Sequence, residues 1–331
     1  MTYSFSRIDG LLLEGRYELL REIKGSTGAG RVKIGRMLEC RYCSTRRANQ
    51  FRKIAHTFPE ALGNKWVISL DECDQCNQLF SLYEGALANA VSPFLTLGGV
   101  RGKGNKTRQT GRTAGNEVLE QRRTETGRQF LAVANGYNLN SFASVNSNGN
   151  FEIKIPIAGV PFVPRLAYKA LAKMGYALLP DDELQNYQKL KAWLLDTNDR
   201  VDFPVLECGM SFASIGHAPP FVAGCLLRRV AAKGMHPHII FIFCAGSICF
   251  QLDLLSDHLE DHIPPVPCGA IGINYSVIIG DDKGERLLTF DYGMPIHINW
   301  ASQASTPQPV ETMILNFNPQ TLKGEFTPVF R

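Results

Sequence analysis

The chain has 331 residues, of which 44% are hydrophobic and 20% charged, so its composition is typical of a globular protein with a substantial core and room for two domains. No run approaches the ~18 consecutive apolar residues of a membrane helix, which excludes an integral membrane protein of that kind. The net charge of +4 is uneven: residues 1–130 carry 21 Lys and Arg against 13 Asp and Glu, and residues 131–331 carry 14 against 18. The basic first part therefore indicates a polyanionic partner.

The first hundred residues predict short elements around two pairs of cysteines. Residues 8–24 have a helical pattern, and residues 31–43 predict a strand that runs into the first pair. Residues 65–70 predict a second short strand, and residues 73–91 a helix that begins at the second pair. A metal ion bound by both pairs would join these elements.

A basic stretch without periodicity follows. Residues 98–128 hold eight Lys and Arg against three Asp and Glu, which predicts a flexible loop or linker. We place the domain boundary in this region, with a first domain at 1–97, a linker at 98–148 and a second domain at 149–331. Five cations of the linker are predicted to contact nucleic-acid phosphates, although a solvated linker is the alternative: Arg101, Lys103, Lys106, Arg108 and Arg112.

The second part predicts an antiparallel sheet with two helices packed on it. Residues 164–179 predict a helix with a proline in its first turn, and residues 181–196 predict a second helix that starts with acidic side chains. Beyond residue 200 the apolar period changes to two, and two hairpins are predicted, HIIFIFC with SICFQLDLL and INYSVIIG with ERLLTFDYG. The predicted fold class is therefore α+β.

Four of the nine cysteines form two C-x2-C pairs separated by 29 residues, Cys40 with Cys43 and Cys73 with Cys76. Zinc prefers four such ligands at tetrahedral corners, so the spacing predicts one structural Zn²⁺. Two disulfides are the alternative, and the charged first 25 residues, which do not predict a secretory signal, disfavour them. The other five cysteines are predicted to be small buried hydrophobes in a reducing, cytoplasmic compartment: Cys208, Cys225, Cys244, Cys249 and Cys268.

A characteristic set of residues lies between the cysteine pairs and directly after them. His56, Pro59 and Gly63 follow one another in AHTFPEALGN, and Asn77 comes directly after the second pair. With the cysteines, this ordered set resembles the HNH endonuclease family in its four-cysteine ββα-metal form, from Cys40 to about Glu84. The wording of the segment is similar to one bacterial branch of that family.

The resemblance implies a metal-dependent hydrolase that cleaves the phosphodiester bonds of double-stranded DNA. It implies that His56 is the general base that activates water, and that Asn77 contacts a catalytic Mg²⁺ or Mn²⁺ ion, which stabilises the scissile phosphate. The structural zinc would hold the loop and the helix together so that these two side chains face each other.

The sequence departs from the family pattern at two positions. Ala55 stands where many members carry a metal ligand, and the middle asparagine of the motif is expected to be replaced by Ser69. A metal held by Asn77 alone would bind weakly, so another ligand is expected. Glu84, seven residues along the helix from Asn77, is the leading candidate, and Asp71 and Asp74 are the others.

The leading functional prediction is an HNH endonuclease whose second domain regulates or assembles it, in a bacterial defence system against phage. Two alternatives remain open: a non-catalytic zinc module that binds nucleic acid, and a nuclease subunit that is inactive without a partner protein. A homo-oligomer or an activating partner fits the leading prediction, and no membrane association is expected.

Overall fold

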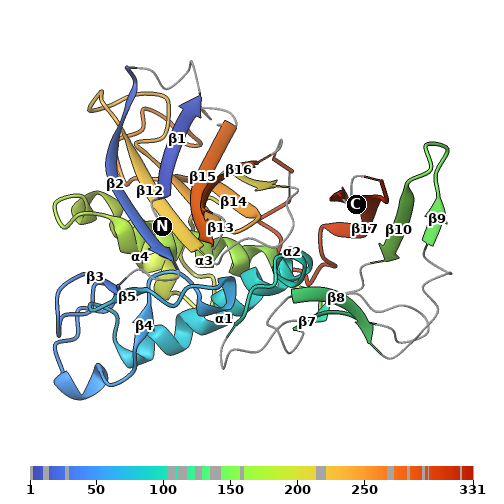
Figure 1. The fold of residues 1–331 in the computed structure, drawn as a ribbon. Coiled ribbons are helices and arrows are strands. Elements are labelled where there is room, and N and C mark those ends of the chain that lie inside the picture. The colour runs from blue at the N-terminus through green and yellow to red at the C-terminus, as the bar shows by residue number, and fades with distance from the viewer. Residues whose placement is uncertain are drawn as a thin grey trace.

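The computed structural model describes most of the 331 residues. They are 3–9, 15–26, 30–102, 109–110, 118–123, 129–134, 143–156, 160–213, 221–266, 272–281, 284–292, 295–296, 298–320 and 323–330. Within them the chain forms five small sheets and four α-helices, and the predicted α+β class is confirmed (Figure 1). No helix in these ranges is long and apolar enough to cross a bilayer.

The largest sheet is antiparallel and has five strands in the order β11-β14-β13-β12-β2. Its strands are β11 (Cys208–Phe212), β14 (Ile248–Leu254), β13 (Ile239–Ala245), β12 (Phe221–Arg229) and β2 (Tyr17–Ser26). Every residue of β13 is buried, because the strand is central and apolar throughout. The predicted hairpin of β13 and β14 is confirmed, and the sulphurs of Cys244 and Cys249 lie 3.3 Å apart across it.

Strand β2 corrects the helix predicted for residues 8–24. It pairs antiparallel with β12 from Ser26 opposite Phe221 to Tyr17 opposite Arg229. The helical pattern was wrong here because pairing with a strand two hundred residues away overrides a weak local preference. An early segment of the chain therefore completes the sheet of the second part.

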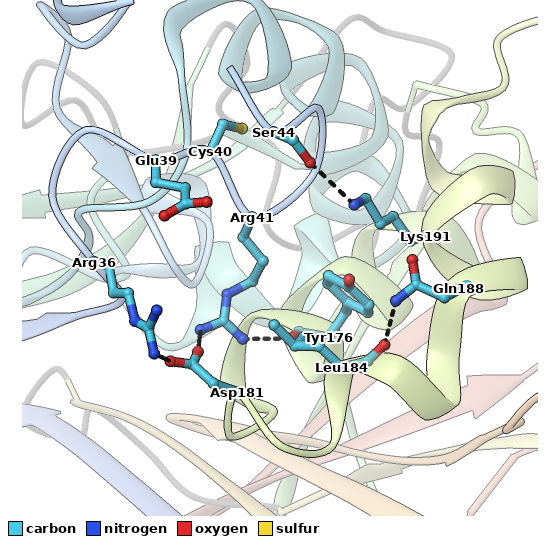
Figure 2. Close-up of a pocket in the computed structure, with 10 residues that line it drawn as sticks. All are labelled: Arg36, Glu39, Cys40, Arg41, Ser44, Tyr176, Asp181, Leu184, Gln188 and Lys191. Carbon is cyan, nitrogen blue, oxygen red and sulfur yellow. Dashed lines mark hydrogen bonds and ion pairs between the residues drawn. The ribbon is translucent and has the colours of Figure 1, made fainter. Parts of the chain in front are cut away.

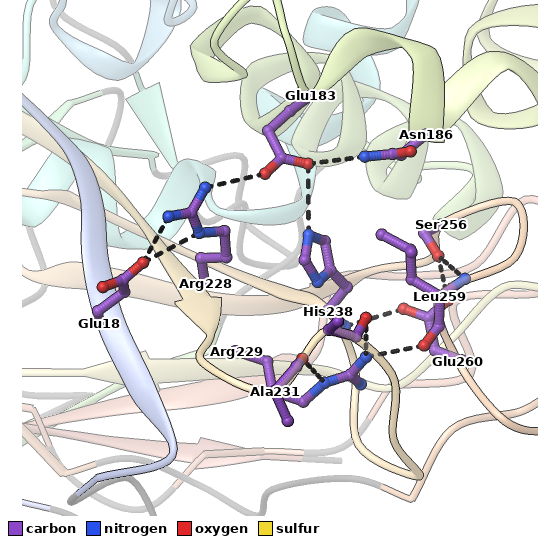
Figure 3. A network of polar contacts seen from close by, with 11 residues as sticks. Glu18, Glu183, Asn186, Arg228, Arg229, Ala231, His238, Ser256, Leu259 and Glu260 are labelled. Atoms are coloured by element: carbon purple, nitrogen blue, oxygen red, sulfur yellow. Dashed lines mark hydrogen bonds and ion pairs between the residues drawn. The ribbon is translucent and has the colours of Figure 1, made fainter.

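A polar network fastens β2 and β12 to the loop before α4 (Figure 3). Glu183 accepts hydrogen bonds from Arg228 at 3.3 Å and from Asn186 at 3.0 Å, and its other contact is the ring of His238 at 3.3 Å. The guanidinium of Arg228 also contacts Glu18 of β2. Shared partners of this kind hold the edge strand and the helical layer in one arrangement.

The helical layer contains α1 (Asp74–Ala90), α2 (Ser92–Leu97), α3 (Pro164–Leu178) and α4 (Gln188–Leu195), with a 3₁₀ turn at Leu184–Tyr187. Helices α1 and α3 lie side by side (Figure 1). Gly175 lets α3 approach the sheet, because a Cβ there would lie 2.9 Å from Leu254 and 3.1 Å from Phe241. Both α1 and α3 confirm the predicted helices, whereas the second predicted helix begins as a 3₁₀ turn.

The segment between the cysteine pairs forms a small mixed sheet in the order β3-β5-β4. Its strands are β3 (Val32–Ile34), β5 (Val67–Ser69) and β4 (Ala55–His56), with 3₁₀ turns at Ala48–Gln50 and Glu60–Leu62. Phe58, in the loop after β4, packs against the large sheet: its ring centroid lies 4.9 Å from that of Phe243, and Gly224 leaves room for it.

Three more sheets complete the described chain. One contains β6 (Gln109–Thr110), β7 (Val118–Arg123) and β8 (Gln129–Ala134); the second contains β9 (Ala143–Val145), β10 (Phe151–Pro156), β17 (Val310–Asn318) and β18 (Lys323–Phe330); the third contains β1 (Tyr3–Asp9), β15 (Gly272–Asp281) and β16 (Gly284–Asp291). The antiparallel pair of β7 and β8 lies inside the stretch 98–148 that is predicted to be a linker. The division of the chain at residues 97 and 149 stays a prediction.

Candidate active site

The four paired cysteines form one cluster in which all four sulphur atoms lie within 4.8 Å of one another. The Sγ of Cys40 lies 3.8 Å from that of Cys76, and the Sγ of Cys43 lies 3.5 Å from that of Cys73. A tetrahedral zinc with Zn–S bonds of about 2.3 Å requires sulphurs about 3.8 Å apart. Spacing and donor type both fit Zn²⁺, and none of the four forms a disulfide.

Local backbone structure places each pair. The first pair lies in a turn closed by hydrogen bonds from the Ser44 amide to the Cys40 oxygen and from the Cys40 amide to the Thr45 oxygen, both 2.9 Å long. Cys73 is the N-cap residue of α1, and Cys76 lies in the first turn of that helix. The helix therefore presents both sulphurs of the second pair toward the turn that carries the first.

His56 lies on β4, opposite Ile68 of β5. The side chain is partly buried, and within the described chain its Nδ1 atom is buried without a hydrogen-bond partner. Desolvation lowers the pKa of His56 below 6.5; Glu60 opposes the shift, and the nearby cations Lys173, Lys65 and Arg31 add to it. A neutral imidazole with an unused ring nitrogen can accept a proton at neutral pH.

Asn64 organises the loop that follows His56. Its side-chain nitrogen donates to the backbone oxygens of Phe58 and Val67 at 2.8 and 2.9 Å, and its side-chain oxygen accepts from the amides of Trp66 and Val67 at 3.0 and 2.9 Å. The asparagine is completely buried, and these bonds use both N–H groups of its side-chain amide and both lone pairs of its oxygen. They connect Phe58 at the start of the loop with Trp66 and Val67 at its end.

Ser69, which is expected to take the place of the middle asparagine, makes different contacts from Asn64, and that expectation stays a prediction. Ser69 is buried on β5, and its hydroxyl is 3.1 Å from that of Thr57. It has no bond to the loop backbone of the kind that Asn64 makes, since one hydroxyl cannot bridge four backbone groups. Asn64, five residues earlier in the chain, makes these bonds.

Asn77 follows Cys76 in the first turn of α1 and is partly exposed. Its amide donates to the backbone oxygen of Cys73 at 2.9 Å, so the metal cluster and the helix fix its position. Its role as a metal ligand stays a prediction, as does the catalytic role of His56.

The three carboxylates considered as extra metal ligands all have other partners. Glu84 accepts a hydrogen bond from Lys173 at 3.2 Å, Asp71 forms a buried ion pair with Arg41 at 2.7 Å, and Asp74 accepts the amide of Lys53 at 2.9 Å. In the part of the chain that the structure describes, the cysteine cluster is the only group of three or more His, Cys, Asp or Glu residues that can hold a metal. One oxygen of Glu84 is engaged by Lys173 in this arrangement, and its role as a ligand of a catalytic ion stays a prediction.

Two charged residues near His56 were missed from the sequence. Lys173 of α3 and Glu72, which precedes Cys73, are both buried and lie 3.0 Å apart. Burial raises the pKa of Glu72 to about 7, although the ammonium opposes this shift. Burial alone lowers the pKa of Lys173, but Glu72 and Glu84 outweigh it and raise that pKa, so the lysine is charged. The available signal was a pair of lysines, at 169 and 173, inside a helix whose other residues are mostly apolar.

Of the five cations predicted to contact phosphates, Arg101 is described, partly buried, and its Nε has no hydrogen-bond partner within the described residues. The other four lie outside the described residues: Lys103, Lys106, Arg108 and Arg112. Beside Arg101, the oxygen of Gly102 accepts a hydrogen bond from Lys65 at 3.0 Å, which ties the start of this basic stretch to the loop after His56.

A pocket of about 380 Å³ lies beside the cysteine cluster, between the first C-x2-C turn and the segment from α3 to α4 (Figure 2). Its charged side chains largely neutralise one another, since Asp181 pairs with Arg36 at 2.6 Å and with Arg41 at 3.5 Å. Lys191 of α4 reaches Ser44 at 3.4 Å across the mouth (Figure 2). His56 and Asn77 do not line this pocket.

Comparison with protein families matches residues 40–83 to the HNH endonuclease family. The matched segment begins at the first cysteine of the cluster and ends within α1, so it contains the cluster, His56, Asn64 and Asn77. Searches of curated proteins and of solved structures gave no significant match. The resemblance stated from the sequence is thus confirmed for this segment, which is similar to the HNH endonuclease family.

Proposed function

We propose that this protein is a metal-dependent endonuclease that hydrolyses the phosphodiester bonds of DNA, with residues 40–83 as its HNH nuclease module. The observation that carries the proposal is the arrangement around His56. The four-cysteine cluster, whose spacing fits zinc, fixes the position of the start of α1. The pairing of β4 with β5 and the hydrogen bonds of Asn64 fix the position of His56. The Nδ1 atom of His56 is buried and has no hydrogen-bond partner among the described residues.

In the proposed reaction His56 accepts a proton from the attacking water, and its neutral state at pH 7 suits that role. Asn77 offers an amide oxygen from a rigid first helical turn to a Mg²⁺ or Mn²⁺ ion. When bound, such an ion would supply charge stabilisation of the scissile phosphate. Magnesium sites often keep several waters and use substrate phosphate oxygens as ligands. We therefore propose that phosphate oxygens of the DNA complete the coordination shell of the ion in place of Glu84.

The basic balance of residues 1–130 and the position of Arg101 support DNA as the polyanion. We propose that the cations at 101, 103, 106, 108 and 112 contact its backbone. We also propose that the remainder of the chain regulates or assembles the nuclease, as in a defence system, within a reducing cytoplasm. The eight described cysteines, none of which forms a disulfide, support the last point.

A non-catalytic zinc module that binds nucleic acid is the second candidate. It is favoured by Ala55, which offers no ligand beside His56, and by the engagement of Glu84 with Lys173. A nuclease subunit that needs a partner protein is compatible with the same two observations.

Cleavage of supercoiled plasmid DNA by the purified full-length protein, with Mg²⁺ or Mn²⁺ and with EDTA as a blank, decides between these candidates. His56→Ala is expected to bind DNA like the wild type and to cut it about 100- to 10,000-fold more slowly. His258→Ala, which changes an exposed histidine, is the matched control. Binding without cleavage by the wild type would favour the non-catalytic module, and equal cleavage by wild type and His56→Ala would contradict the proposed base.

A further inference from the structure

Lys173 is a fully buried lysine of α3 whose ammonium points into the HNH module. Its side chain has no exposed surface, and its Nζ donates to the backbone oxygen of His56 at 3.0 Å and to Glu84 at 3.2 Å. The third neighbour is Glu72, whose Oε2 lies 3.0 Å away. An ammonium has three N–H groups. Two of them are used in these hydrogen bonds, and Glu72 adds an ion pair.

The three acceptors belong to three different parts of the nuclease module. His56 lies on β4, Glu72 comes directly before the second cysteine pair, and Glu84 lies in the third turn of α1. Lys173 itself lies about ninety residues beyond the end of the segment that matches the family. One side chain from the second part of the protein therefore ties together the strand, the helix start and the helix body of the site.

Burial makes this contact costly to lose. Neither carboxylate oxygen of Glu72 receives a well-aligned hydrogen bond within the described chain, so the charge on Glu72 is compensated by Lys173. The ammonium also lies 5.6 Å from the ring centroid of Phe80. A charge that is removed from water keeps its place through such partners, and its geometry is correspondingly fixed.

We propose that Lys173 is a positioning residue of the nuclease site: it fixes the backbone of His56 relative to α1, so that helix α3 completes an HNH module that is unfinished on its own. The catalytic part of this inference rests on the proposed function. Lys173 acts through the carbonyl of His56 and through the two glutamates, and it does not touch the substrate. The same contact occupies Glu84 and withholds it from a metal ion.

Lys169 provides a matched control one helical turn earlier. It is also buried, but it donates to the backbone oxygen of Asp196 at 2.7 Å and lies 4.7 Å from the ring centroid of Trp193, away from His56. Lys169→Met thus removes a second buried ammonium from the same helix, one that lies 5.4 Å from the ring centroid of Tyr83 in α1 but away from His56. It reports what the loss of a buried lysine does in general.

The experiment compares Lys173→Met, the double variant Lys173→Met with Glu72→Gln, and Lys169→Met in the full chain. The double variant removes both charges, so it stays folded even where Lys173→Met alone does not. We expect its kcat for plasmid cleavage to fall about 100-fold with little change in KM, because the misplaced base affects the chemical step and not DNA binding. Lys169→Met is expected to keep the wild-type kcat after correction for its folded fraction.

Histidine-selective NMR gives a second readout that needs no activity. The ring resonances of His56, assigned by their absence in His56→Ala, should move in the double variant, and their titration should shift to higher pH because a nearby cation is gone. If no variant and not even the wild type cuts DNA, the proposed function fails, and NMR alone still decides whether Lys173 positions His56. Unchanged His56 resonances, or a kcat equal to that of Lys169→Met, would overturn the proposal.

Discussion

Arg41 and Asp71 form a buried ion pair between the two cysteine-bearing segments, with 2.7 Å between Nε and Oδ2. The same guanidinium donates to the oxygen of Leu179 at 2.6 Å, just beyond the end of α3. Asp71 lies directly under Gly35, because a Cβ on Gly35 would come within 2.0 Å of its carboxylate. The turn after β3 and the ion pair therefore occupy one closely packed space.

Gly35→Ala should destabilise the protein by about 3 kcal/mol or more. The added methyl displaces Asp71 from Arg41 and leaves a buried charge without its partner, and the residue also has a φ of 82° that alanine adopts poorly. Gly85→Ala is the control: its Cβ meets no neighbouring atom, and alanine in the interior of α1 should stabilise the fold by about 1 kcal/mol. Urea unfolding of the two variants measures both effects, and equal destabilisation would contradict the packing argument.

Zinc content is the next prediction. Elemental analysis should find one tightly held zinc per chain, because the four sulphurs already have the spacing that tetrahedral coordination requires. Cys73→Ser should lose most of this metal, whereas Cys225→Ser, in the buried sheet, should keep it. A purified protein that contains no metal and is equally stable would contradict the predicted zinc site.

Asn64 should matter far more than Ser69. Asn64→Ala breaks four hydrogen bonds inside a buried loop and should cost about 2 to 4 kcal/mol, together with most of the proposed nuclease activity, since the loop directly follows His56. Ser69→Ala removes one contact with the Thr57 hydroxyl and should cost about 1 kcal/mol. Thermal unfolding and plasmid cleavage measure the losses of stability and activity in the two variants. A larger loss in Ser69→Ala than in Asn64→Ala would show that Ser69 takes the place of the middle asparagine.

The pH dependence of cleavage follows from the lowered pKa of His56. A base works only when it is unprotonated, so activity should rise with pH and level off above the pKa of His56, and this midpoint should lie below pH 6.5. Lys65→Met removes one of the cations that lower this pKa and should move the midpoint upward. A midpoint well above pH 6.5 in the wild type would show that another group limits the rate.

Metal titrations separate Asn77 from Glu84. Asn77→Ala should need more Mg²⁺ or Mn²⁺ for half-maximal activity and should recover at high metal concentration, because it weakens a binding equilibrium. Glu84→Gln should leave the metal requirement nearly unchanged, since its carboxylate is held by Lys173. A metal requirement that rises in Glu84→Gln and not in Asn77→Ala would reverse the assignment.

Features that depend on short spacings were predictable from the sequence. The C-x2-C pairs needed only a turn and one helical turn to bring their sulphurs together, and α1, α3 and the hairpin of β13 and β14 were predicted within a few residues. In each case neighbouring residues carry the information, because a helix or a hairpin repeats the same local geometry.

The remaining features were decided by contacts between distant segments. Residues 8–24 have a helical sequence pattern, but part of them forms strand β2 because it pairs with β12. The contribution of Asn64 depends on four hydrogen bonds with the backbone that the sequence pattern does not indicate. Lys169 and Lys173 stand one helical turn apart, a spacing that in a sequence indicates a solvated face. Both are buried because α1 and the chain beyond α4 cover that face, and burial then selects the partners of each ammonium. The sequence alone determined the four cysteines that could bind zinc and the place of His56 between them, whereas the tertiary structure decided which charges surround that histidine.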